Sequence, residues 1–312
     1  MSGWDACKIP LIIISPSYRL LITVLSIIAG NPFQRRETHS HGSVLAYKIF
    51  TLLTWLVSVI VSVYYSTGWY HHKIDFHRIW DLNDAHRTAF TMNHILAEVY
   101  WVVLFVLQFG YATSLFSSSA EVVHAAANVG SHFIFNNIFH IIFVLLFVNS
   151  HFAIAEVILI LNFANLSSLY FRHNTAPRFI HVPVASGPLA WTFVAIYWNG
   201  AIMVPHPHTL VARIFGNIFI WSILVYGLFF IVTYSDYTMG FALSVLSAAI
   251  GVAQFKRQVI AFQWIFAFVI MAVLFVLTIA IAAPRAAGRD ARWRRITSAD
   301  QERAPLLNES AA

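Results

Sequence analysis

The stretch HAAANVGSHFIFNNIFH at residues 124–140, with the apolar run IIFVLLFV at 141–148, decides the fold class. Polar residues recur in it at every fourth position: His124, Asn128, His132, Asn136 and His140. Four residues turn an α-helix by about 400°, so successive members drift by only about 40° and form a band along one helix. A helix that carries imidazoles and amides into a membrane needs partners from other spans or from a passing solute.

The composition supports a membrane location for the whole chain. Of 312 residues, 59% are hydrophobic and only 10% are charged, and the mean hydropathy is +0.71. A soluble domain carries about 25% charged residues, so the few charges here cannot cover the surface of a soluble body of this size. The net charge of +6 gathers near the expected membrane ends, which indicates topology and argues against a nucleic-acid partner.

Hydropathy predicts an all-α, polytopic helical membrane bundle with about eight transmembrane helices, in contact with membrane lipids. The expected spans are about 44–65, 94–116, 129–149, 152–171, 186–204, 211–234, 238–254 and 260–282 within a bundle at 44–283. The polar tail at 284–312 is predicted to be disordered and cytosolic.

Residues 1–43 form an apolar extension followed by a basic segment. Pro16 and Arg19 divide the apolar residues 9–30 into two pieces that are each too short to span a membrane. The extension fits a signal peptide poorly, because it lacks one unbroken apolar core followed by a small-residue cleavage site. Two alternatives stay open: an extra N-terminal membrane segment, spanning or re-entrant, and an extension lying at the interface.

The placement of Lys and Arg predicts that both termini are cytosolic. Arg35 and Arg36 precede the first span, and five arginines follow the last one: Arg285, Arg289, Arg292, Arg294 and Arg295. Two cytosolic ends require an even number of spans, which agrees with eight. Lys256 and Arg257 do not follow this charge rule, because the eight-span topology places their short loop on the non-cytosolic side.

Two groups of residues are candidates for a polar site within the membrane: the ladder residues His132, Asn136 and His140, and the pairs His94 with Glu98 and His151 with Glu156. Both pairs fall near the non-cytosolic face, where two carboxylates and two imidazoles suit an ion or proton site. The alternative for the ladder is hydrogen bonding between helices, and the alternative for the pairs is snorkelling to the interface.

Any metal must be held without cysteine clusters, because Cys7 is the only cysteine. His132 and His140 are the candidate ligands if a metal is bound. The sequence contains no HExxH or related zinc-site spacing, and we expect no cofactor.

Three further segments carry weaker signals. The loop at 66–93 is expected to be solvated, with Trp69, Tyr70 and Trp80 as anchors at the membrane interface. Small residues spaced four apart in the 238–254 segment, beginning with Gly240 and Ser244, predict close packing against neighbouring helices. Asp236, just before that segment, is expected at the interface.

The C-terminal tail contains an acidic dileucine pattern formed by Glu302, Leu306 and Leu307. Clathrin adaptor complexes bind such peptides in an extended form, with a basic patch for the acid and apolar slots for the leucines. The pattern favours the vacuolar or endosomal membrane, with the plasma membrane as the alternative.

Several stretches resemble a fungal family of multipass membrane proteins that is defined only as a domain of unknown function. They include NPFQRRE at 31–37, AAANVGSHFIFNN at 125–137, DYTMGFALSVLSAAIGV at 236–252 and QWIFAFVIMAVLFVL at 263–277. The resemblance covers roughly residues 31–283. It implies a fungal source and a multipass fold, and it assigns no activity, catalytic residue or binding residue.

Three functions are consistent with the sequence. The first is a transporter-like bundle that passes or senses a small solute, ion or proton through its polar interior. The second is a structural membrane organiser in which the polar residues only hold helices together. The third is a metal-dependent intramembrane enzyme, which the sequence favours least because it shows no recognised metal-site spacing and no clear Ser or Asp nucleophile beside a His.

Overall fold

The computed structural model describes residue 33 and residues 39–67, 78–173, 177–206, 209–257 and 262–286. All regular secondary structure in these ranges is helical. The apolar residues 9–30 lie outside them, and so do Trp69, Tyr70 and the dileucine pattern of Glu302, Leu306 and Leu307.

In the described part of the chain, eight helical segments are long and apolar enough to cross a membrane, which confirms the predicted all-α membrane class and the expected eight spans. Six of them are single helices: α2 (His41–Thr67), α4 (His94–Ser114), α5 (Ala120–Val148), α6 (Phe152–Arg172), α11 (Tyr237–Arg257) and α12 (Gln263–Ala286). The other two are composite. One joins α7 (Arg178–His181), η1 (Val182–Ser186) and α8 (Gly187–Met203), and the other joins α9 (Leu210–Phe219) and α10 (Trp221–Tyr234). The chain is therefore a multipass membrane protein.

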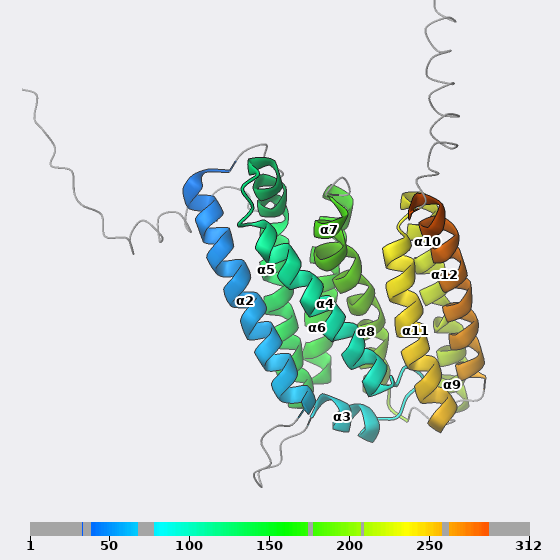
Figure 1. Cartoon of the computed structure of the whole chain (residues 1–312). Coiled ribbons are helices and arrows are strands. Elements are labelled where there is room, and N and C mark those ends of the chain that lie inside the picture. The colour runs from blue at the N-terminus through cyan, green and yellow to red at the C-terminus, as the bar shows by residue number, and fades with distance from the viewer. Residues whose placement is uncertain are drawn as a thin grey trace, which may run out of the picture.

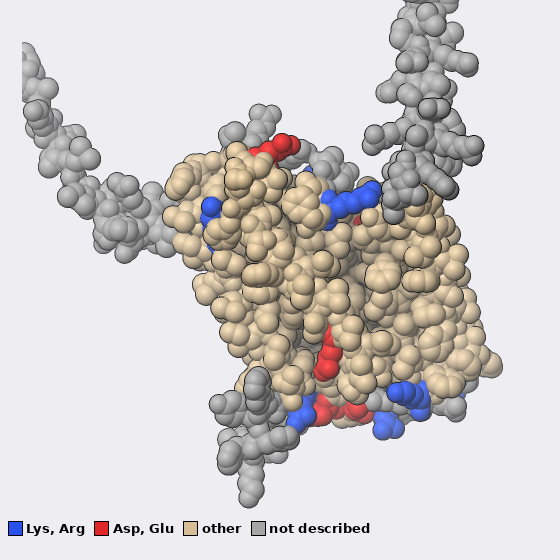
Figure 2. Space-filling model, in the orientation of Figure 1, with Lys and Arg blue, Asp and Glu red and all other residues tan. Residues whose placement is uncertain are grey.

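The two ends of the bundle differ. Figure 1 shows α2 beginning and α12 ending at one end, here called the terminal end, while the short helix α3 (Ile79–Ala85) lies across the other, here called the α3 end. Figure 2 shows the charged side chains gathered mostly at these two ends of the visible face, with a wide band of other residues between them. This distribution fits a membrane crossing, because charges in the lipid core are costly.

Several helices extend beyond the apolar runs in the sequence. Helix α5 begins at Ala120, before the expected span at about 129–149, because alanine favours a helix whereas Glu121 and His124 are unsuited to a lipid core. Helix α11 reaches Arg257 and has 21 residues, enough at 1.5 Å per residue to cross a membrane about 30 Å thick. Hydropathy identifies the apolar part of a helix that can lie in lipid, so the expected span is shorter than the helix in both cases.

The span from Arg178 to Met203 contains a π-helical turn, η1. Pro183 and Pro188 lack the N–H groups that regular helix bonding needs, and the Gly187 N–H donates to the carbonyl of Val182, five residues back. The side-chain amide of Gln108 on α4 donates to the carbonyl of Pro183 (3.4 Å). The side chain of Gln108 on α4 thus supplies a hydrogen-bond donor to a carbonyl in the turn where the two prolines lack N–H groups.

Helix α11 is one of the most enclosed helices and packs along α12. A Cβ atom at Gly240 would lie 2.6 Å from both Ile231 on α10 and Thr278 on α12, so only glycine fits there. Four residues further on, the Ser244 hydroxyl donates to the carbonyl of Met271 at 3.0 Å. The small residues of α11 therefore lie where neighbouring helices approach most closely, as their spacing predicts.

Much of residues 78–93, the described part of the loop before α4, is buried, which corrects the expectation of a solvated loop for that part. Trp80 is 9% exposed and Asn83 is fully buried, so Trp80 is not an interface anchor. The side-chain amide of Gln254 donates to the carbonyls of Thr88 (2.8 Å) and Ala89 (3.0 Å). This backbone fills the α3 end because amides from α11 satisfy its carbonyls, whereas the sequence alone suggests exposed polar groups.

Candidate functional site

The polar ladder of α5 does not face a single partner. His124 accepts the backbone N–H of His39 (3.2 Å), and Asn128 is hydrogen bonded to the His39 ring (3.1 Å). The next two rungs contact α6, and His140 contacts α2. Five rungs that drift by about 40° each cover about 160° of the helix surface, so they reach different neighbours.

His132 and Asn136 connect α5 to α6. His132 Nδ1 lies 2.8 Å from Asn165 Oδ1, and the Asn165 amide donates to the His132 carbonyl at 3.0 Å. The Asn162 amide donates to Asn136 Oδ1 at 3.0 Å. These side chains join the two helices by direct hydrogen bonds, as expected of bonding between membrane helices.

The structure brings two other predicted residues, Glu98 and His140, to one cavity. The cavity has a volume of about 150 Å³ and lies between α2, α3, α4, α5 and α8 near the α3 end. His140 Nε2 is 2.9 Å from the Ser62 hydroxyl on α2. Glu98, one turn into α4, is the sole charged residue among the described residues that line the cavity.

Four tryptophans give this cavity its character, and we call it the tryptophan cavity: Trp80, Trp101, Trp191 and Trp198. Their rings form a continuous series, with centroids 6.1 Å apart for Trp80–Trp198, 6.1 Å for Trp198–Trp191 and 5.1 Å for Trp191–Trp101. The Trp101 ring lies 4.3 Å from that of His140. The lining is therefore rich in aromatic rings and includes one carboxylate and one imidazole.

Local structure explains how the side chains converge. Trp191 and Trp198 lie seven residues apart on α8, two turns along the same face, so both point into the bundle. Trp101 follows Glu98 by three residues on α4 and shares its face. Trp80 arrives from α3, which is held under the bundle by the Asn83 bond to the Trp198 indole N–H (3.0 Å).

The remaining candidates lie elsewhere. Glu156 accepts a hydrogen bond from the Asn199 amide at 2.8 Å, between α6 and α8, and does not line the tryptophan cavity. His94, the first residue of α4, and His151, the N-cap residue of α6, are exposed. The expected single site of two carboxylates and two imidazoles is therefore not formed, because the two pairs belong to different helix contacts.

His132 and His140 do not form one ligand set. They lie two turns apart on α5 and bond to α6 and α2, respectively. Within the described ranges, no group of three or more His, Cys, Asp or Glu residues is arranged to hold a metal ion.

A larger cavity of about 640 Å³ lies between α8, α9 and residues 88–90. Its described lining contains no Asp, Glu, Lys, Arg or His. The tryptophan cavity is thus the smaller of the two but carries the titratable groups, so it is the better candidate for recognising a polar or charged ligand.

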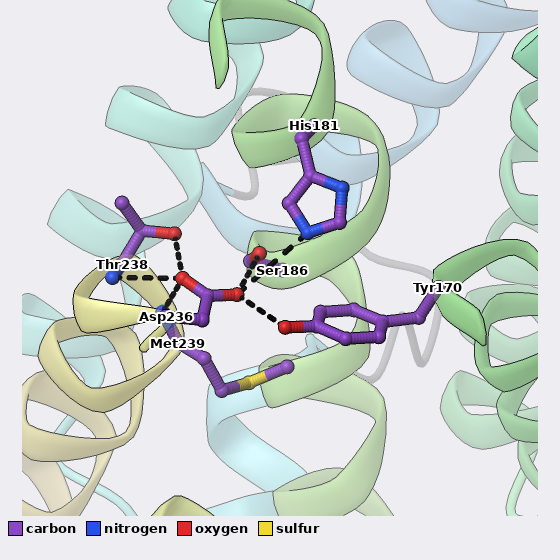
Figure 3. A network of polar contacts seen from close by, with 6 residues as sticks. All are labelled: Tyr170, His181, Ser186, Asp236, Thr238 and Met239. Atoms are coloured by element: carbon purple, nitrogen blue, oxygen red, sulfur yellow. Dashed lines mark hydrogen bonds and ion pairs between the residues drawn. The ribbon is translucent and has the colours of Figure 1, made fainter. Parts of the chain in front are cut away.

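A polar network around Asp236 lies at the terminal end, where sequence reasoning expected only an interfacial side chain (Figure 3). One carboxylate oxygen, Oδ2, accepts from the Tyr170 hydroxyl on α6 (2.9 Å) and the Ser186 hydroxyl at the end of η1 (2.7 Å). His181 Nε2 lies 3.7 Å from the same oxygen. The Asp236 side chain is only 9% exposed, so the network joins α6, η1 and α11 inside the protein.

The second oxygen, Oδ1, caps α11. It accepts from the backbone N–H groups of Thr238 (2.9 Å) and Met239 (3.1 Å), and from the Thr238 hydroxyl (2.5 Å). Burial raises the pKa of the Asp236 carboxyl, but the nearby His181 ring and the hydrogen bonds from Thr238, Ser186 and the Met239 N–H outweigh it and hold the pKa well below its usual range.

The sequence contains one signal for this network. An Asp before an apolar helical run, followed by Tyr and Thr, has the form of a helix N-cap. That pattern identifies the acceptor for α11, whereas the donors Tyr170, His181 and Ser186 come from segments far away in the chain. They become visible only in the fold.

The comparisons with known proteins bear on the C-terminal part of the chain. Residues 213–307 match a family model described as "Fungal protein of unknown function (DUF1774)". This part of the chain fits a fungal family. The match confirms the resemblance and includes Asp236, while the tryptophan cavity comes from residues before it. Searches of curated proteins and of solved structures found no match.

Proposed function

We propose that the protein is a transporter-like membrane bundle that passes or senses a small solute, ion or proton, with the tryptophan cavity as its binding site. The observation that supports this proposal is the meeting of Glu98 and His140, from α4 and α5, at one cavity inside the bundle. Ionisable groups at membrane depth are costly and commonly mark the path of a solute or proton.

Proton flux through reconstituted protein tests this proposal. Proteoliposomes that contain a pH-sensitive dye are given a pH gradient across the membrane. We expect the wild-type protein to dissipate the gradient faster than protein-free liposomes do. Glu98→Gln removes the titratable group while preserving the shape of the side chain, and its rate should fall close to the protein-free rate.

Glu121→Gln is the matched control, because Glu121 is an exposed carboxylate in the first turn of α5 at the terminal end. Its rate should equal that of the wild type. Passage of protons would be excluded if folded wild-type protein dissipated the gradient no faster than protein-free liposomes.

A structural membrane organiser is the second candidate. It is favoured by the bonds of His132 with Asn165 and of Asn136 with Asn162, which join α5 to α6. In this role, alanine at His132 and His140 would lower stability only modestly, by about 0.6 kcal/mol for each interhelical bond. This second function would be favoured if the folded protein showed no proton flux and tolerated alanine at His132 and His140. We do not propose an enzymatic activity.

We also propose that both termini face the cytosol and that the tail directs the protein to the vacuolar or endosomal membrane through a clathrin adaptor. The basic residues that flank the first and last spans support this orientation. In cells, Leu306→Ala/Leu307→Ala is expected to move a fluorescently tagged protein from internal membranes to the plasma membrane. An unchanged distribution would contradict the sorting proposal, and Leu210→Ala, outside the tail, is the control.

A further inference from the structure

The tryptophan cavity has the size of one compact chemical group. A cavity of about 150 Å³ matches an engineered apolar cavity that holds one benzene molecule. Pockets for drug-sized ligands are larger, at about 300–1,000 Å³. A ligand would therefore place one small chemical group in the cavity, and any larger part of the ligand would lie outside it.

The cavity opens toward the side of the bundle. Its deep wall includes Trp198 and Phe143, which are 1% and 3% exposed. At its rim, Val63 on α2 and Val102 on α4 are 41% and 61% exposed. An apolar rim on two membrane helices allows the hydrophobic part of a ligand to rest against lipid while its head enters.

The chemistry of the walls selects a positive charge. Glu98 supplies one negative charge, and no Lys or Arg is found among the described lining residues to neutralise it. Tryptophan rings from α3, α4 and α8 line the cavity, and tryptophan is the strongest aromatic partner for a cation. Aromatic walls with a carboxylate are the arrangement that recognises quaternary ammonium groups.

An inorganic cation fits these walls less well. Calcium and magnesium ions take about six or more oxygen ligands. Apart from Glu98, the side chains of the described lining offer three oxygens, the hydroxyls of Ser62, Ser66 and Thr67. An organic ammonium group needs no such oxygen cage, because it is held by ring faces and one counter-charge.

We propose that the tryptophan cavity binds an organic ammonium head group, held between the tryptophan rings and paired with Glu98. The inference deepens the proposed function and rests on it for the location of the site. Two sources share this chemistry: a free amine and the head group of a choline lipid.

Equilibrium binding of radiolabelled choline to the purified full-length protein in detergent tests the proposal. We expect saturable binding that tetramethylammonium displaces and that 3,3-dimethylbutanol, the neutral isostere of choline, does not. Glu98→Gln should weaken binding at least about tenfold. Trp101→Leu should weaken it more than Trp101→Phe, because phenylalanine keeps an aromatic face. Glu121→Gln should bind like the wild type.

Soluble short-chain lipids distinguish the two sources. Displacement of choline by dihexanoylphosphatidylcholine, but not by dihexanoylphosphatidylglycerol, would assign the site to a lipid head group. Choline binding that neither lipid displaces would assign it to a free amine.

Three results would overturn the inference: no saturable choline binding, equal displacement by the neutral isostere, or wild-type affinity in folded Glu98→Gln. These outcomes are separate from the flux test. Choline binding without proton flux would retain the ammonium site and exclude proton transport, whereas Glu98-dependent proton flux without choline binding would retain transport and exclude the ammonium ligand.

Discussion

Asp236→Asn is expected to lower the free energy of unfolding by about 3 kcal/mol. The carboxylate accepts hydrogen bonds from Tyr170, Ser186 and the first turn of α11, and it is nearly buried. Asparagine keeps one acceptor oxygen and turns an amide donor toward groups that are themselves donors. Unfolding of the purified protein by denaturant in detergent micelles, followed by circular dichroism, measures the loss.

Asp81→Asn is the matched control, since the Asp81 side chain is 62% exposed and lies 3.8 Å from Arg78 in a surface pair. We expect a change of no more than about 0.5 kcal/mol for it. An Asp236→Asn variant as stable as this control would show that the Asp236 network does not hold the terminal end together.

The effect of Asp236 should also depend on pH. Its pKa is lower in the folded protein than in the unfolded chain, where it is about 3.9. Its contribution is therefore fully present well above the unfolded pKa and is lost as the pH falls toward the folded pKa. The difference in unfolding free energy between wild type and Asp236→Asn should be constant above about pH 5 and should narrow below about pH 4.

Asn83→Ala is expected to cost about 3 kcal/mol, because several buried polar groups lose their partner at once. Asn83 Oδ1 accepts from the Trp198 indole N–H (3.0 Å) and the Met92 N–H (3.2 Å), and its amide donates to the Met92 carbonyl (3.0 Å). The same bonds position Trp80 and Trp198 in the tryptophan cavity. We therefore expect weaker choline binding together with the lower stability.

Asn149→Ala is the control for this variant. Asn149 is exposed, and its amide donates to the carbonyl of Leu145 in its own helix (2.7 Å). Its unfolding free energy should change by less than about 0.5 kcal/mol. Equal stability of the two variants, measured by the same denaturant titration, would mean that the α3 end does not depend on Asn83.

The polar residues show where sequence reasoning succeeds and where it stops. The spacing of His132, Asn136 and His140 correctly places them on one helix, since helical periodicity is local. Their partners Asn165, Asn162 and Ser62 depend on which helices pack beside α5 and at what rotation. The same limit explains why Glu98 and Glu156, both one turn into a span, belong to different sites.

The loop before α4 shows a second limit. Its polar residues suggest solvent exposure, yet Asn83 and the carbonyls of Thr88 and Ala89 are buried and hydrogen bonded. The partners are Trp198 on α8 and Gln254 on α11, which are more than 100 residues away. Burial of a polar group is decided by the presence of such a partner, and a local pattern does not contain it.

The sequence by itself determined the membrane class, the eight spans and their order. A segment in lipid must satisfy its backbone hydrogen bonds internally, so a sufficiently long apolar run becomes a helix wherever it packs. Only the tertiary structure decided that Glu98 and His140 share a tryptophan-lined cavity and that Asp236 joins α6, η1 and α11. Those arrangements depend on helix rotation and contact, which are set by close packing between residues distant in the chain.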